Sequence, residues 1–62
     1  MRKEDHMKYI VICTLHNGDV IPAFASTFKL ATDIADMFVH SEYPSSVEII
    51  TLATGARTRY IY

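Results

Sequence analysis

The first pattern along the chain is a pair of apolar runs within residues 8 to 25, both rich in β-branched and aromatic side chains that favour strands. Asn17-Gly18 lies between the two runs. This dipeptide is the strongest short signal for a β-hairpin, because both residues tolerate the positive φ angles of a type I′ turn. The pattern predicts a hairpin with a two-residue loop, and in its strand register Cys13 pairs with Pro22.

Both faces of this predicted hairpin are apolar, whereas a hairpin with one solvated face alternates apolar and polar residues. Pro22 has no backbone N–H, and a proline within a sheet is tolerated where that group would point away from a neighbouring strand. We therefore expect the second strand at an edge of the sheet and the first strand in a central position.

Residues 27 to 42 follow a helical period instead. Ser26 or Thr27 can cap the N-terminus of this helix, and Pro44 ends it by disfavouring helical geometry at Tyr43. The apolar stripe consists of Leu30, Ala31, Ile34, Ala35, Met37 and Phe38.

The remaining residues predict a second pair of strands. Residues 47 to 52 are rich in β-branched side chains, and residues 57 to 62 alternate as a last strand. Thr54-Gly55 marks the turn between them. Because threonine disfavours positive φ, we expect a three-residue loop with a bulge at Gly55, and this pattern leaves its register open.

These elements define an α+β fold of the order ββαββ. With the second strand at an edge, the strands form an antiparallel four-stranded sheet of order 2-1-3-4, with one helix packed on one face. Residues 1 to 6 are polar and read as a flexible tail, and residues 7 to 62 form a single domain, with either Met1 or Met7 as the start. The side chains predicted to be largely buried are Ile12, Val20, Leu30, Ile34, Phe38 and Ile49.

Size and composition bear on assembly. The chain has 62 residues, a net charge of −1 and one cysteine, Cys13, so an internal disulfide is impossible. Domains of this size often gain stability from oligomerisation, and one helix can cover only one face of the sheet. We therefore expect a homodimer. The lack of a disulfide framework fits a cytoplasmic location, and the apolar runs are too short to span a membrane, so we expect no association with membranes.

The side chains that could carry catalysis or bind a metal are scattered. His6, His16 and His40 lack the spacing of metal ligands, and Cys13 lies in an apolar strand with no positive neighbour to lower its pKa. Neither of the two glycines belongs to a phosphate-binding loop. We expect no enzyme activity, no metal and no cofactor.

The most suggestive segment is the last strand, where arginine and tyrosine, residues enriched at binding hot spots, are interleaved. Three interpretations remain open: a half-buried terminal strand with arginines in solvent, a protein-binding strip, or a single-stranded nucleic-acid site that combines stacking with phosphate contacts. The near-neutral net charge disfavours the third. The candidate partner-binding residues are Arg57, Arg59, Tyr60, Ile61 and Tyr62.

Residues 19 to 51 combine a Val-Ile-Pro strand, a capped helix and a Val-x-Ile strand. This layout resembles that of small phage-encoded host-takeover proteins, such as the phage inhibitors of host RNA polymerase. The resemblance implies a small protein that blocks a host enzyme with charged strand and helix residues, with Arg57 and Arg59 in the place of paired strand arginines. The acidic strip of that family is missing here, so the resemblance favours a phage or mobile-element origin more than RNA polymerase as the target.

The sequence therefore predicts a small non-enzymatic protein that inhibits or modulates a larger protein partner. The alternative is a small nucleic-acid-binding or transcription-modulating protein that uses the arginines and tyrosines of the last strand. A third reading is a structural subunit of an assembly.

Overall fold

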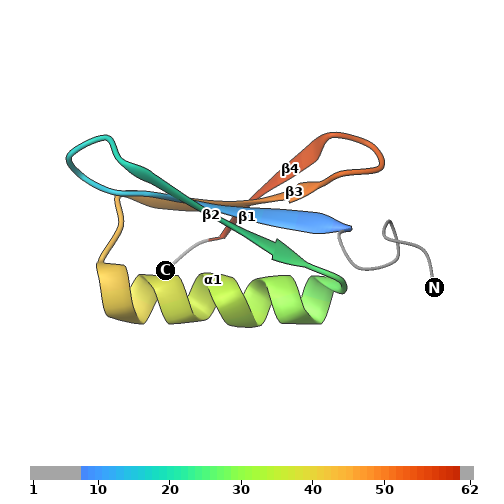
Figure 1. Ribbon diagram of the computed structural model, residues 1–62, viewed down its shortest axis with the longest axis horizontal. Coiled ribbons are helices and arrows are strands. Elements are labelled where there is room, and N and C mark those ends of the chain that lie inside the picture. Colours follow the sequence, from blue (N-terminus) through green and yellow to red (C-terminus); the bar gives the residue numbers. More distant parts are fainter. Residues whose placement is uncertain (1–7, 61–62) are drawn as a thin grey trace.

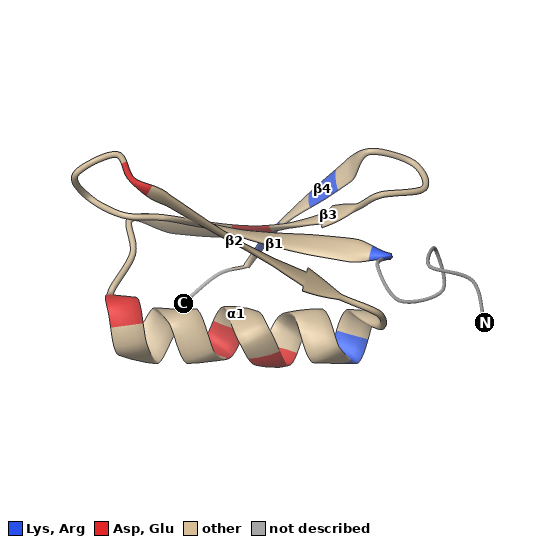
Figure 2. Cartoon of the chain, viewed as in Figure 1, with Lys and Arg blue, Asp and Glu red and all other residues tan. Residues whose placement is uncertain are grey.

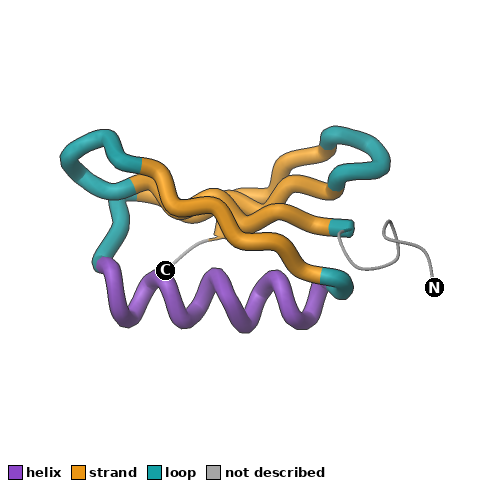
Figure 3. Tube along the Cα trace, viewed as in Figure 1, coloured by secondary structure: helices purple, strands orange, loops and turns teal. Residues whose placement is uncertain are grey.

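A computed structural model describes residues 8–60, which form four strands and one helix (Figure 1). A helix lies along one face of a twisted sheet, so this part of the chain has two layers (Figure 3). The elements are β1 (Tyr9–Thr14), β2 (Val20–Ala25), α1 (Phe28–Glu42), β3 (Ser46–Thr51) and β4 (Ala56–Tyr60).

The sheet has the order β2-β1-β3-β4, and all three pairs of neighbours are antiparallel. The predicted fold class, strand order and helix position are confirmed. The expectation drawn from Pro22 also holds, because β2 is an edge strand and β1 lies between β2 and β3. The predicted tail, at residues 1 to 6, and Met7 lie outside the described residues.

The predicted register of the first hairpin is wrong by one residue. The N–H of Leu15 donates to the carbonyl of Asp19 at 2.8 Å and the N–H of Gly18 donates to that of Leu15 at 3.0 Å, so the loop has three residues. Cys13 therefore pairs with Ile21 instead of Pro22. Gly18 has a φ of 95°, but Asn17 is not in the positive-φ region, as a two-residue type I′ loop would require.

The side chain of Asn17 explains why the three-residue loop suits this sequence. Its Oδ1 accepts from the N–H of Asp19 at 2.9 Å, and its Nδ2 donates to the Asp19 carboxylate at 3.1 Å. The loop is thus a tight turn followed by a glycine bulge, with the asparagine bonding to the chain two residues on. Because strand side chains alternate between faces, this one-residue change turns every β2 side chain to the opposite face.

The second hairpin also differs from its prediction. Thr51 pairs with Ala56, so the loop has four residues instead of three, and β3 and β4 each begin one residue earlier than expected. The turn is closed by the N–H of Gly55, which donates to the carbonyl of Thr51 at 2.7 Å. Gly55 has a φ of 77°, so the predicted positive-φ position is confirmed.

The helix begins and ends where the sequence predicts. The Oγ1 of Thr27 accepts from the N–H of Leu30 at 3.1 Å, which identifies Thr27 as the N-cap. Tyr43 has a φ of 49° and a ψ of 57°, in the left-handed region, and this change of direction before Pro44 ends the helix.

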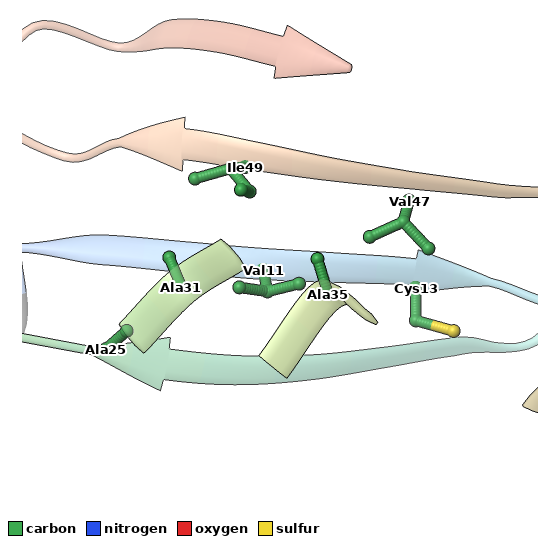
Figure 4. Close-up of a cluster of buried hydrophobic side chains, with 7 residues drawn as sticks. All are labelled: Val11, Cys13, Ala25, Ala31, Ala35, Val47 and Ile49. Atoms are coloured by element: carbon green, nitrogen blue, oxygen red, sulfur yellow. The ribbon is translucent and has the colours of Figure 1, made fainter. Parts of the chain in front are cut away.

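The core between α1 and the sheet is small and contains several small side chains. Ala31 and Ala35 of α1 are fully buried and lie over β1 on either side of Val11, as Figure 4 shows. Because alanine has only a methyl group, the helix can approach the sheet closely. The fully buried hydrophobic residues of this core are Val11, Cys13, Ala25, Ala31, Ala35, Val47 and Ile49.

The predicted set of buried residues is correct only in part. Ile49 is buried, and Ile34 and Phe38 are half-buried against the core. Val20 and Leu30 are 53% and 43% exposed, so their predicted burial is wrong. Val20 is exposed because the corrected register places it on the face that α1 does not cover, and Ile12 is half-buried on that same face.

Among residues 8–60, no helix is long and apolar enough to cross a membrane.

Truncating Ile49 should remove a large share of the domain's stability. The Ile49→Ala change removes most of a side chain that is 1% exposed, at an expected cost of about 2–5 kcal/mol. A domain of this size has a total stability of only about 3–9 kcal/mol. Urea unfolding followed by circular dichroism measures the loss. Met37→Ala, at an exposed helix position, is the control and should change stability by less than about 0.5 kcal/mol. Equal stabilities for the two variants would contradict this description of the core.

Candidate functional site

The candidate site is the sheet face opposite α1, which we call the open face. The described part of the chain contains no second helix or other layer on this side (Figure 1). The pairing registers place residues of all four strands in cross-strand rows on it. Its residues are Ile10, Ile12, Thr14, Val20, Pro22, Phe24, Ser46, Glu48, Ile50, Arg57 and Arg59.

One half of the open face is apolar. Phe24 pairs with Ile10, and Ile10 pairs with Ile50, so three apolar side chains follow one another across β2, β1 and β3. Ile12 and Pro22 form the next row, and Val20 completes the surface near the hairpin loop. Phe24 and Val20 are each 53% exposed, which is a high value for such side chains in a folded domain. The apolar half consists of Ile10, Ile12, Val20, Pro22, Phe24 and Ile50.

The other half, over β3 and β4, is charged. Nη1 of Arg57 lies 3.6 Å from Oε1 of Glu48, and Arg59 pairs with Glu48 in the strand register. Within residues 8–60, Arg59 forms no ion pair or hydrogen bond through its side chain. This half thus holds two arginines and one carboxylate, and the charges lie beside the apolar half instead of within it.

The structure divides the predicted partner-binding residues between two faces. Arg57 and Arg59 lie on the open face, whereas Tyr60 lies on the side of α1 and packs against the core. The hydroxyl of Tyr60 donates to Oδ1 of Asp36 at 3.3 Å. Ile61 and Tyr62 lie outside the described residues. Tyr60 therefore supports the contact between β4 and α1 and does not form one surface with the arginines.

The outward surface of α1 has a different character. It carries the acidic residues Asp33, Asp36 and Glu42, with Lys29 near its beginning (Figure 2), together with exposed apolar side chains, Phe28, Leu30 and Met37. Lys29 and Asp33 form an exposed ion pair at 3.4 Å, and the protonated Nδ1 of His40 donates to the backbone carbonyl of Asp36 at 2.8 Å. No group of three or more potential metal ligands occurs within residues 8–60.

Cys13 is the one described thiol, and it points toward the helix. Its side chain is fully buried, and burial together with the negative charge of Glu42 raises the pKa of the Cys13 thiol. A neutral, shielded thiol is a poor nucleophile, because the thiolate is the reactive form.

Comparisons of the chain with protein-family models, with curated proteins and with solved structures each find no match. The resemblance to phage inhibitors of host RNA polymerase therefore stays a prediction, and the open face has to be interpreted from its own chemistry.

Sequence reasoning pointed to the arginines of this site but not to its apolar half. The residues that it missed are all six of the apolar half: Ile10, Ile12, Val20, Pro22, Phe24 and Ile50. The signal was present, because both faces of the first hairpin were recognised as apolar although one helix covers one face. Assigning residues to faces required the loop length, which Asn17-Gly18 alone does not determine.

Cys13 should be protected from thiol reagents in the folded state. Ellman's reagent at mildly alkaline pH should label it about a hundredfold more slowly than in denaturant, because labelling must wait for the structure to open. The control is Cys13→Ala combined with Ala53→Cys, which moves the thiol to an exposed loop and should restore rapid labelling. Rapid labelling of native Cys13 would show that the core opens easily.

The pKa of Tyr60 should lie above the ordinary value for tyrosine. Partial burial is the main cause, and the Asp36 carboxylate adds to it through its charge and its hydrogen bond, with a smaller effect from Asp33. A raised folded-state pKa means that the folded protein favours the neutral phenol. The linked stability is present below the ordinary tyrosine pKa and is lost as pH rises through the folded value.

Subtracting the phenolate absorbance titration of Tyr60→Phe from that of the wild type isolates this group. Asp36→Asn should move the isolated titration to lower pH. No movement in Asp36→Asn would show that the carboxylate does not contact the hydroxyl in solution.

Proposed function

We propose that this protein is a non-enzymatic binding domain that docks on a larger protein through the open face and thereby inhibits or modulates it. The observation that supports this is the uncovered apolar half, where Phe24 and Val20 are each 53% exposed. Contiguous apolar surface bordered by polar groups is typical of protein-interaction sites.

The arrangement of the open face fits a protein partner well. Protein interfaces combine an apolar centre with a polar rim, and arginine and aromatic side chains are common hot spots. Here Phe24, Ile10 and Ile50 supply the apolar centre, and Arg57 and Arg59 lie at one border. The arginines would orient a partner that presents a carboxylate next to apolar side chains.

The alternative, nucleic-acid binding by the last strand, has less support. Base stacking combined with phosphate contact requires aromatic and basic side chains on one surface. Tyr60 lies on the opposite side of the sheet from Arg57 and Arg59, and one of these arginines is paired with Glu48. The exposed acidic side chains of α1 add repulsion toward phosphates (Figure 2).

A pair of photoreactive variants tests the proposal. A photoreactive phenylalanine derivative replaces Phe24 on the open face or, as the control, Met37 on α1, which is exposed to a similar degree, 57%. Cross-linking in cells of the source should yield a heterologous product from position 24 but not from position 37. Mass spectrometry then identifies the partner.

The captured protein must next bind the domain in purified form. Val20→Lys should abolish this binding and Met37→Lys should leave it unchanged, because only the first change places a charge in the apolar half. Equal capture from both positions, or undisturbed binding by Val20→Lys, would refute the open face as the docking site. Binding of single-stranded nucleic acid that weakens steeply with salt would favour the alternative.

A further inference from the structure

The two edges of the sheet are poorly suited to pairing with a second copy of this chain. Along an antiparallel pair of strands, residue pairs that exchange hydrogen bonds alternate with pairs that do not. At the β2 edge, Leu15 and Asp19 form a hydrogen-bonded pair, so Ile12 and Pro22 form a pair without hydrogen bonds. The backbone hydrogen-bonding groups of Val20, Pro22 and Phe24 thus point away from β1, toward the open edge. The middle residue of the three has no N–H to donate, which weakens strand addition at this edge.

At the β4 edge, arginines oppose self-pairing. Antiparallel pairing of β4 with its own copy uses a two-fold axis perpendicular to the sheet, and this axis keeps every side chain on its own face. In registers centred on Arg57, Thr58 or Arg59, an arginine of one copy lies opposite an arginine of the other. Like charges directly opposite each other destabilise a strand pair.

We propose that, in the absence of its larger partner, the open face is covered by the open face of a second copy, forming a two-fold symmetric homodimer. The apolar half of one copy packs on the apolar half of the other, and Arg57 and Arg59 remain at the solvated rim. The dimer uses the same surface as the proposed function, so the larger partner would bind in competition with the second copy.

The size of the open face sets the expected strength of this dimer. Four strands spaced ~4.8 Å apart and about 20 Å long present a face of roughly 400 Å², and side-chain relief increases its accessible area. Contact over two complete open faces would bury roughly 1,000 Å² in total, and contact centred on the apolar halves buries less, so the interface lies at or below the lower limit for a specific one. The net charge of −1 causes little repulsion between copies. A weak dimer that dissociates at micromolar concentrations is therefore expected, and a larger partner could replace the second copy.

Analytical ultracentrifugation over a range of concentrations tests the proposal. The wild type should change from a mass of 7.1 kDa toward twice that value as concentration rises. Phe24→Lys should weaken dimerisation by about tenfold or more, because it places a charge in the centre of the interface. Met37→Lys is the matched control, with the same change in charge at a similarly exposed position on α1, and should dimerise like the wild type.

A measurement on the unaltered protein covers the case in which Phe24→Lys fails to fold. On dilution, amide chemical shifts of Ile10, Ile12 and Ile50 should change together, while those on the outward side of α1 stay constant. A wild type that is monomeric at all concentrations, or a dimer disrupted by Met37→Lys and not by Phe24→Lys, would overturn the proposal.

The outcomes separate this proposal from the proposed function. A monomer that still cross-links a heterologous partner through position 24 would retain the docking function and reject the dimer. A dimer with no heterologous product would retain the dimer and reject the docking function.

Discussion

The contact between the alanines of α1 and one face of the sheet is the interaction on which the rest of this structure depends. Ala31 and Ala35 are fully buried, and Ala25 faces them from β2. These small side chains let the helix lie close to the sheet, so that Val11 and Ile49 are enclosed although the layer between helix and sheet is thin. The same close contact limits the amount of apolar area that the domain can bury, because alanine contributes little.

One helix on a four-stranded sheet leaves the other face uncovered within residues 8–60. The sequence contains apolar residues for both faces of the first hairpin, and the open face receives Phe24, Val20 and Ile10. Within a small monomer, this exposed surface brings no stability and favours aggregation. Its presence beside two arginines is the observation on which the proposed docking surface rests. The edges fit the same proposal, since Pro22 at one edge and the arginines at the other disfavour strand addition.

Much of the fold could be predicted from the sequence, because its signals are local and consistent. Thr27 caps the helix and Pro44 ends it, as predicted. The position of Pro22 correctly predicted that β2 is an edge strand and that β1 is central. The exposure of Leu30 could not be predicted in the same way. Its spacing fits the apolar stripe, but the contact with the sheet is centred on Ala31 and Ala35, so Leu30 lies at the flank of the helix and is exposed.

The loop of the first hairpin shows why the site was harder to predict than the fold. Asn17-Gly18 suits a two-residue loop, and that loop would turn Phe24 and Pro22 toward α1. Such bulky residues would keep the helix away from the sheet. The three-residue loop turns Ala23 and Ala25 toward α1 instead, which makes the close contact with Ala31 possible. The tertiary packing thus decides between two loops that the local sequence allows. The same choice places Phe24 and Val20 on the open face, so the packing of the core also determines which surface is available for binding.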